Sequence, residues 1–412
     1  MIDDDTPLLA KLRVVEIASM VLAPSAAVIM ADYGAEVVKV EPIGSGDLNR
    51  NWHKIPGLPI SDFAYPFQVD NRNKKSVAID LKTEAGYEVI RKLVSEADVL
   101  ITNYRLKALE RLNLEYDTVR EINPSIIYAL ATGFGEKGDE RHKPGYDSVS
   151  YWVRSAIETQ IFPYEGWLRP FPYGAGDHPS GMTLFAAIMT GLYKRQQTGE
   201  GSKVSTSLLA NGAWANSVML QAQLSGAEFR EVRPRDNSYN FVSLHYATKD
   251  NRLMKLSIVN FNKDWEPFCL ALARPDILTD PRFSTAEARS ANMAALILEI
   301  TQVFKTQEMD YWHKKLEEAD IPHAAVPTYT ESADDKQKEA NDIIVPLDHP
   351  EYGKMRTVNS PFEVSGADKI KPGAAPKLGQ HTKEVLKAVG YSDSVINEWL
   401  ASGVIAQSSE PE

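Results

Sequence analysis

The residue with the strongest claim to chemistry is an aspartate, Asp177, in the small-residue loop at 173–181. It follows Gly176 and stands just before a long apolar stretch, so small neighbours would let a substrate reach its carboxylate. N–H groups near a helix start can stabilise an anion, and a carboxylate can act as a covalent nucleophile. The same pattern also describes a helix N-cap, formed by Asp177 or by Ser180. The residues alone favour the cap.

The histidine next to Asp177 is expected to make a local hydrogen bond rather than to bind a metal. No second histidine stands at ligand spacing from His178, and the eight histidines are scattered along the chain. The single cysteine, Cys269, excludes a disulfide framework and a cysteine-rich metal centre. No Gly-x-Ser-x-Gly elbow or phosphate-binding Walker loop is present. The sequence therefore predicts no metal site.

Several basic residues follow predicted strands in the first half of the chain. Guanidinium groups at strand ends could grip phosphates, although each base alone could equally be solvated surface. The set comprises Arg50, Arg72, Lys74, Lys75, Arg105, Lys107 and Arg111. Taken together, these bases favour a phosphorylated ligand.

A nicotinamide cofactor is not expected. Gly44 and Gly46 follow a predicted strand, but the full Gly-x-Gly-x-x-Gly spacing is missing. The loop after the first strand, at 19–23, has no glycine that would let a pyrophosphate approach. The pair at 44–46 is read as a turn.

The overall charge limits the partners. The chain of 412 residues has a formal net charge of -11, which argues against nucleic acid or an anionic membrane as a partner. No apolar run approaches the length that crosses a bilayer. The start is acidic and unlike a signal peptide, and one thiol suits a reducing compartment. The sequence predicts a cytoplasmic protein.

Short β-rich runs alternate with helical stretches through the first half, which predicts an α/β fold with a large, open, doubly wound sheet. The predicted strands are 12–17, 36–40, 76–79, 99–102, 126–132, 203–207 and 321–326. The predicted helices are 24–33, 82–97, 106–112, 118–122, 182–196, 208–224 and 382–389. We expect a large α/β domain at 1–225, a smaller α+β domain at 226–325, a segment at 326–404 that returns to the large domain, and a disordered tail at 405–412.

At this point the ordered motifs resemble those of the class III CoA transferases, the family of formyl-CoA transferase, carnitine CoA-transferase and α-methylacyl-CoA racemase. The likeness spans nearly the whole chain. Its motifs lie at 12–16, 23–24, 33–42, 44–50, 73–81, 98–105, 123–124, 133–135, 198–201, 280–283, 321–322 and 376–382. The family's nucleophilic aspartate lies in a Gly-Asp-x-x-x-Gly-like loop, which matches Gly176-Asp177 through Gly181.

The resemblance therefore implies that Asp177 is the nucleophile, ionised at neutral pH, with Asp147 as an orienting acid. The family's racemase has Gly-His-Asp where this chain has Gly145-Tyr146-Asp147. A tyrosine replaces imidazole poorly as an acid/base, so Tyr146 favours CoA transfer over racemisation. Acyl-CoA racemase or isomerase remains the alternative.

The resemblance also implies the ligand contacts. CoA is a substrate, carried as acyl-CoA, and no tightly bound cofactor is expected. The implied CoA contacts are Ala23, Pro24, Arg50, Lys75, Asn103, Tyr104, Arg105 and Arg111. The implied substrate pocket includes Tyr146, Trp152, Gly176 and His178, and Trp152 with Trp167, Phe171 and Tyr173 could line a large acyl site. We assign the oxyanion donors to N–H groups of the 173–181 loop.

The implied assembly is an intertwined, ring-like homodimer. A structural subunit paired with a paralogue is a further alternative. Formyl-CoA transferase has a basic residue where this chain has Pro42 and Ile43, and its first-loop glutamine matches Val21. The small acids formate and oxalate are therefore not expected as substrates.

Overall fold

The computed structural model describes residues 6–161 and 171–408, and the chain divides into two compact units. The first contains the described residues up to Gly226 and those from Gln337 onward, and the second contains Ala227–Lys336. The sequence placed these two boundaries at 225 and 325. The returning segment therefore joins the first unit later than expected, and helix α15 (Tyr329–Ala333) belongs to the second unit.

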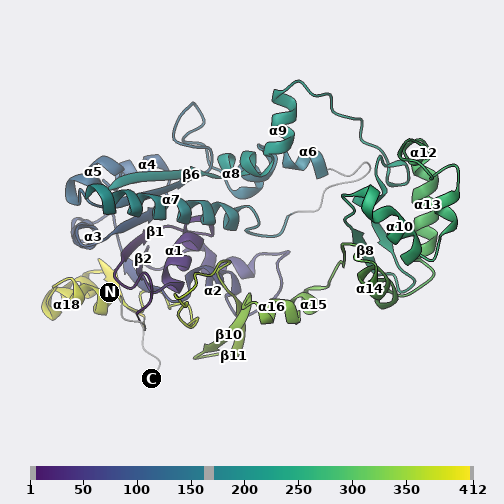
Figure 1. The fold of residues 1–412 in the computed structure, drawn as a ribbon. Helices are drawn as coiled ribbons and strands as arrows, with labels where there is room; N and C mark the ends of the chain where they lie inside the picture. Colours follow the sequence, from purple (N-terminus) through teal and green to yellow (C-terminus); the bar gives the residue numbers. More distant parts are fainter. Residues whose placement is uncertain (1–5, 162–170, 409–412) are drawn as a thin grey trace. The chain divides into compact units, whose positions relative to one another are not determined.

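The first unit is built on a seven-stranded sheet with the order β12-β3-β2-β1-β4-β5-β6 (Figure 1). Strands β1 to β6 are parallel, and β12 runs antiparallel at the edge beside β3. The strands are β1 (Arg13–Ile17), β2 (Glu36–Glu41), β3 (Lys75–Ile79), β4 (Val99–Thr102), β5 (Ile127–Thr132), β6 (Ser202–Ser207) and β12 (Ile405–Ala406). The expected mixed α/β fold with a large, mostly parallel sheet is confirmed.

Helices cover both faces of this sheet, which explains why its central strands β1, β4 and β5 are mainly apolar. The helices α1 (Leu22–Asp32) and α7 (Asp177–Thr198) pack on one face together with the start of α8 (Leu208–Ala215). The opposite face is covered by α3 (Glu84–Ser95), α4 (Leu106–Arg111), α5 (Tyr116–Ile122), α17 (Thr382–Ala388) and α18 (Asp393–Ser402).

Shorter elements complete the first unit. They are η1 (Leu48–Lys54), α2 (Tyr65–Asn71), η2 (Ser148–Val153), α6 (Ile157–Ile161), α9 (Ser217–Leu224), α16 (Lys336–Ala340) and the hairpin of β10 (Ile344–His349) and β11 (Gly353–Val358). Element η2 is a single π-helical stretch, a form that is frequent at functional sites.

The second unit has its own apolar core around a small antiparallel sheet of β7 (His245–Ala247), β8 (Leu253–Leu256) and β9 (His323–Ala325). Its helices are η3 (Arg235–Asn237), η4 (Phe241–Ser243), α10 (Phe261–Ala271), α11 (Asp276–Thr279), α12 (Ala286–Ala291), α13 (Met293–Phe304), α14 (Met309–Glu318) and α15. This is the α+β texture that the sequence predicts for the middle of the chain.

Two expectations about particular elements are wrong. The predicted helix at 208–224 is interrupted at Asn216, whose φ of -97° and ψ of 18° separate α8 from α9. The residues from 405 do not all form a free tail, because Ile405 is buried and pairs with Ile79 of β3. Two residues are too short a run to show a strand pattern.

Candidate functional site

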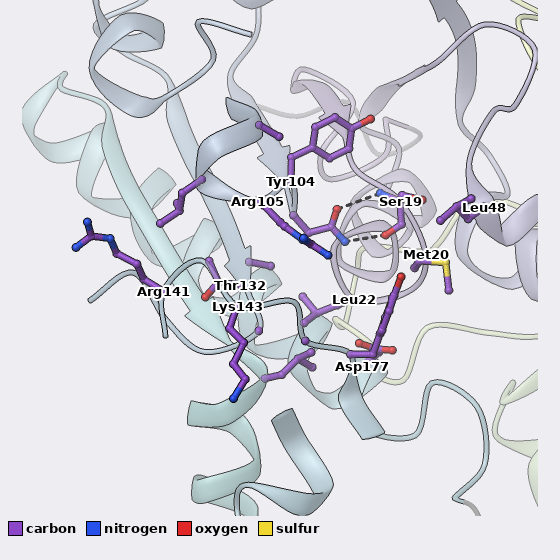
Figure 2. A pocket seen from close by; sticks show the side chains of 18 of the residues that line it. Ser19, Met20, Leu22, Leu48, Tyr104, Arg105, Thr132, Arg141, Lys143 and Asp177 are labelled. Carbon is purple, nitrogen blue, oxygen red and sulfur yellow. Dashed lines mark hydrogen bonds between the residues drawn. The ribbon is translucent and has the colours of Figure 1, made fainter. Parts of the chain in front are cut away.

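The site lies where the order of the sheet reverses, between β1 and β4. Both neighbours run parallel, and their following loops leave in opposite directions, which opens the crevice in which doubly wound sheets bind ligands. Two hydrogen bonds tie these loops together: Ser19 N donates to Asn103 Oδ1 at 3.0 Å, and Asn103 Nδ2 donates to Ser19 O at 2.7 Å (Figure 2). Asn103 thus fixes the floor of the crevice.

A cavity of about 460 Å³ occupies this crevice, within the usual range for small-molecule sites. It brings together six of the residues that the sequence singled out: Asn103, Tyr104, Arg105, Arg111, Tyr146 and Asp177. Figure 2 shows Asp177, Arg105, Arg141 and Lys143 around it. The cavity therefore holds a carboxylate together with several bases.

Asp177 does not cap α7. It is the first residue of that helix, Gly176 takes the N-cap position, and no side chain caps the start. Ser180 is engaged differently, since its Oγ donates to Gly176 O at 2.7 Å. Both capping interpretations are wrong, and the Asp177 carboxylate faces the cavity.

The ionisation of Asp177 also differs from expectation. Burial and the nearby Asp147 and Asp70 raise its pKa, His178 lowers it, and the result is a pKa of about 7. A free aspartate would be fully ionised at neutral pH. In this site the ionised fraction of the Asp177 carboxylate at neutral pH is therefore lower than that of a free aspartate.

Asp147 lies directly beside the start of α7. Its Oδ2 accepts a hydrogen bond from Gly176 N at 3.1 Å. A Cβ on Gly176 would lie 2.8 Å from the Tyr151 ring and 3.0 Å from Asp147 Cβ, so only glycine fits. Asp147 thus holds the backbone that carries Asp177.

Three N–H groups of this loop already donate to other oxygens. Ala175 N donates to Pro172 O, Gly176 N to Asp147, and His178 N to Gly174 O. These three are not free to serve as oxyanion donors, so the role assigned to the loop from the sequence stays a prediction for its other N–H groups.

The His178 ring lies between two acceptors. Its Nδ1 is 3.0 Å from Gly174 O, and its Nε2 is 3.0 Å from Asp70 Oδ1.

Trp152 stacks on Phe171 with ring centroids 3.8 Å apart. Trp167, named with it in the sequence, lies outside the described residues. Within the described ranges no cluster of histidine, cysteine or acidic side chains could hold a metal ion.

Comparison with known proteins agrees with this geometry. A model of CoA-transferase family III matches residues 9–382. The chain belongs to this family. The (R)-2-hydroxy-4-methylpentanoate CoA-transferase of Clostridioides difficile is 34% identical over 401 residues, covering 97% of this chain and 99% of that protein. The cinnamoyl-CoA:phenyllactate CoA-transferase of Clostridium sporogenes is 31% identical over 404 residues, covering 96% and 97%.

A solved CAIB/BAIF family protein from Brucella suis has the same fold, with a TM-score of 0.80 and 27% identity, covering 93% of this chain and 100% of that one. The predicted family and the predicted activity, transfer of CoA between carboxylic acids, are confirmed by these matches. The chain is thus a family III CoA transferase.

Four of the CoA contacts implied for this transferase do not line the cavity. Ala23 and Pro24 are buried inside α1. Arg50 is held by both oxygens of Glu41, with N–O distances of 2.7 Å. Lys75 stands at the start of β3, away from the carboxyl ends of the strands, and pairs with Glu36 and Glu384.

Two other bases of the predicted set are structural as well. Arg72 binds Asp32 at 2.6 Å, and Lys74 binds Glu16 at 2.6 Å, with these side chains almost wholly buried. Lys107 lies beside Arg105, Arg111 and His142 around a second hollow of about 420 Å³. The set therefore divides into buried ion pairs and a basic cluster next to the cavity.

The sequence missed Arg141 and Lys143, which line the cavity with Arg105 and Arg111. Their signal was available, because two bases within three residues stand just before Gly145-Tyr146-Asp147. This signal is weak because the two bases lie in a loop rather than directly after a strand.

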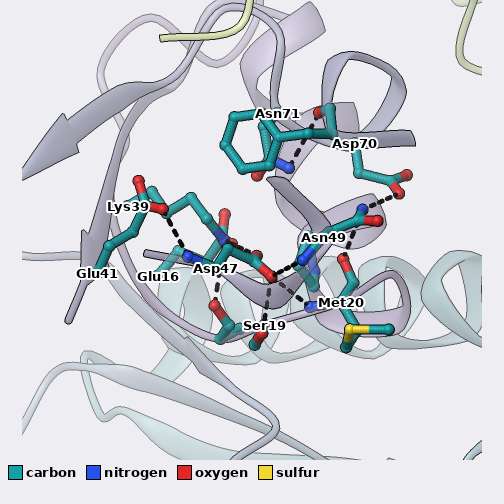
Figure 3. Close-up of polar contacts among 12 residues, drawn as sticks. Glu16, Ser19, Met20, Lys39, Glu41, Asp47, Asn49, Asp70 and Asn71 are labelled. Carbon is teal, nitrogen blue, oxygen red and sulfur yellow. Dashed lines mark hydrogen bonds and ion pairs between the residues drawn. The ribbon is translucent and has the colours of Figure 1, made fainter. Parts of the chain in front are cut away.

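A buried charge network supports the first loop of the transferase (Figure 3). Lys39 Nζ lies 2.6 Å from Glu16 and 2.8 Å from Asp47, and all three side chains are inaccessible to solvent. Asp47 Oδ1 accepts from Ser19 Oγ at 2.7 Å and from Met20 N at 2.9 Å. Met20 has a φ of 70°, which is unfavourable for a residue with a side chain. Asp47 thus holds a strained residue in the cavity wall.

Proposed function

We propose that Asp177 carries the CoA between the donor and the acceptor acid. The observation that supports this most is the Asp177 carboxylate at a cavity whose walls include Arg105, Arg111, Arg141 and Lys143. CoA is strongly anionic through its phosphates, so these bases would bind it while its thiol reaches Asp177. The bases act in binding and the carboxylate acts in chemistry.

The first half-reaction has two steps. The Asp177 carboxylate attacks the donor thioester carbonyl, the C–S bond breaks, and CoA leaves as thiolate from a mixed anhydride. The thiolate then attacks the Asp177 carbonyl carbon. A new C–S bond forms, the anhydride C–O bond breaks, and the donor acid leaves as carboxylate. An aspartyl-CoA thioester remains.

The second half-reaction reverses these steps with the acceptor. Its carboxylate attacks the aspartyl thioester and releases the thiolate, which then attacks the acceptor carbonyl and frees Asp177. No step gains or loses a proton. For this reason we propose that the enzyme needs no tightly bound cofactor beyond the CoA that its substrates carry.

We propose that Asp147 orients the nucleophile rather than reacting. Its bond to Gly176 N fixes the backbone immediately before Asp177. The π-helical η2 begins one residue later and carries Tyr151, against which Gly176 packs. Tyr146, which lines the cavity, would then contact the acyl group.

For the acids, we propose 2-hydroxy acids with a branched or aromatic side chain and their acyl-CoA derivatives. The support is the pair of relatives named for (R)-2-hydroxy-4-methylpentanoate and for cinnamoyl-CoA with phenyllactate. The first-loop departure at Val21 argues in the same direction, against formate and oxalate. A panel of these acids with their CoA thioesters would test the choice.

The decisive experiment replaces the nucleophile. Asp177→Ala should lose transfer by several orders of magnitude while still binding CoA, whereas the matched control Asp139→Asn, an exposed carboxylate, should remain active. Mass spectrometry during turnover should find CoA attached to Asp177. Normal transfer by Asp177→Ala, or CoA on another carboxylate, would refute the proposal. Deuterium entering the α-carbon without an acceptor acid would instead indicate racemisation.

We also propose that the enzyme is a homodimer. Large apolar side chains are exposed on consecutive helices of the first unit: Tyr193 is 63% exposed, Trp214 81%, Val218 72% and Leu224 81%. Such a surface favours burial against a second copy. The intertwined ring form follows the family layout. Native mass of the purified chain would give two copies, and a monomer or a requirement for a paralogue would contradict the proposal.

A cytoplasmic location is proposed on one observation, the buried and unpaired Cys269. No helix among the described residues has the length and apolar character to cross a bilayer. Cell fractionation with activity measurement would test the location.

A further inference from the structure

His178, the neighbour of Asp177, has both ring nitrogens directed at groups that accept hydrogen bonds. Nδ1 lies 3.0 Å from the carbonyl oxygen of Gly174 and Nε2 lies 3.0 Å from Asp70 Oδ1. A carbonyl oxygen can only accept, and so can an ionised carboxylate. The other oxygen of Asp70 faces a donor as well, Asn49 Nδ2 at 3.5 Å.

A neutral imidazole has one N–H and one lone pair, so it would leave one of these two contacts as acceptor against acceptor. Both contacts are satisfied only when both nitrogens carry a hydrogen. The geometry therefore requires a positively charged ring.

We propose that His178 is an imidazolium at neutral pH, held by Asp70 and Gly174, which favours the ionised form of the adjacent Asp177 carboxylate that carries out nucleophilic attack. This inference rests on the proposed function of Asp177. His178 is a positioning residue in this scheme, since it acts through the charge of Asp177.

The charges around the pair explain why a cation is needed. Asp70 from α2 and Asp147 from the segment before η2 both raise the pKa of Asp177, while His178 lowers it. Tyr173, with Oη donating to Asn49, adds no charge at neutral pH because burial raises its pKa well above the usual value. Behind α2, Lys74 is occupied by Glu16. Among the groups that shift the pKa of Asp177, the positive charge is that of His178.

The titration of His178 agrees with this assignment. Burial lowers its pKa, but the charge of Asp70, the hydrogen bonds to Asp70 and Gly174, and the charge of Asp177 outweigh that effect and raise the pKa to about 9. The ring thus stays charged over the range in which Asp177, with a pKa of about 7, becomes ionised.

A fixed cation also suits the reaction. Each transfer step exchanges a carboxylate for a thiolate or the reverse, and no proton moves. An imidazolium with both hydrogens engaged has none to give. It can stabilise the nucleophile without protonating the CoA thiolate that must attack next.

The first test is the pH dependence of kcat/KM for transfer. In the wild type, kcat/KM should rise through about pH 7 as Asp177 ionises and fall above about pH 9 as His178 loses its proton. In His178→Gln the rise should move to higher pH and the fall near pH 9 should disappear. If the pKa of Asp177 rises by one unit, kcat/KM at pH values below that pKa should fall about tenfold.

Two variants separate charge from structure. Asp70→Asn removes the partner that raises the pKa of His178, so the fall should move toward neutral pH. The control His245→Asn, an exposed histidine of the second unit, should leave both limbs in place. If His178 has only a structural role, His178→Gln should lower kcat without moving either the rise or the fall of kcat/KM with pH. That outcome would overturn the inference.

The second test does not depend on turnover. Nitrogen-15 NMR of the histidine rings, with His178 identified by its loss in His178→Gln, should show both nitrogens protonated at about pH 8. A neutral His178 ring, with Asp177→Ala inactive, would overturn this inference and leave the proposed function intact. If the His178 ring is charged but Asp177→Ala is still active, the proposed function would be overturned and the charge state of His178 would stand.

Discussion

Replacing Lys39 with methionine tests the buried network that holds the first cavity loop. Lys39 Nζ contacts Glu16, Asp47 and the Ala18 carbonyl at 2.6, 2.8 and 3.1 Å. Methionine has nearly the same length and leaves no large cavity, but it removes the charge between two carboxylates that no water reaches. Removing one partner of such a buried pair costs about 3–5 kcal/mol.

The remaining donors set the expected value within that range. Glu16 keeps Lys74 at 2.6 Å, and Asp47 keeps the N–H groups of Met20 and Asn49. Because neither carboxylate is left wholly unpaired, we expect the lower end, about 3 kcal/mol. Thermal unfolding should show a melting temperature lower by about 5 °C. The control Lys92→Met breaks an exposed pair with Glu96 and should cost at most about 1 kcal/mol.

The pH dependence of stability gives a second measurement. Burial alone would raise the pKa of Asp47, but Lys39 and the backbone donors outweigh it and hold that pKa below its ordinary value. A carboxylate whose pKa is lower in the folded than in the unfolded state stabilises the fold at pH values above its unfolded-state pKa. This stabilisation is lost as the pH falls through the folded-state pKa. In Lys39→Met the loss should therefore begin at higher pH than in the wild type. Equal melting of Lys39→Met and Lys92→Met at every pH would refute this account.

Three further changes test other parts of the site. Arg141→Met should raise the KM for acyl-CoA about tenfold or more, with a weaker salt dependence, because a charged hydrogen bond contributes about 1.5–3 kcal/mol; an unchanged KM would exclude a phosphate contact. Gly181→Ala should destabilise the enzyme by about 1–3 kcal/mol in denaturant unfolding, since a Cβ there would lie 1.9 Å from Ser25 Oγ; wild-type stability would contradict this close packing of α7 on α1. Asp147→Asn should shift the acid limb of kcat/KM to lower pH, because Asp147 raises the pKa of Asp177; an unmoved limb would show that their charges are not coupled.

The fold was predictable because its strands are buried on both faces. Continuous apolar runs such as Val99–Thr102 leave little doubt about a strand, and the alternation with helices dictates a parallel sheet. The missed elements lack that signal. Strand β10 contains Pro346, and β12 is two residues long. Both are recognisable only from the partner strand beside them.

The candidate site was predictable in part, for a different reason. The sequence indicates which basic residues lie near strand ends, but it does not show which acidic residue each of them pairs with. Arg50 follows a strand as Arg105 does, yet Glu41 binds Arg50 and leaves Arg105 at the cavity. The pKa of Asp177 was likewise beyond reach, because it depends on burial and on carboxylates that are distant in sequence.

The raised pKa of Asp177 has a consequence for how the donor anhydride partitions. In the mixed anhydride, CoA thiolate can attack either carbonyl, and the weaker base leaves more readily. Ordinary carboxylic acids have a pKa well below the value of about 7 for Asp177. Attack on the Asp177 carbonyl, which expels the donor acid, is therefore favoured over attack that restores the donor thioester. Asp147→Asn lowers the pKa of Asp177 and weakens this preference, so in that variant a larger share of the anhydride should return to starting material. Burial and repulsion by Asp147 thus decrease the ionised fraction of Asp177 at neutral pH, and in the same way they favour the aspartyl-CoA thioester over the free carboxylate when an anhydride partitions.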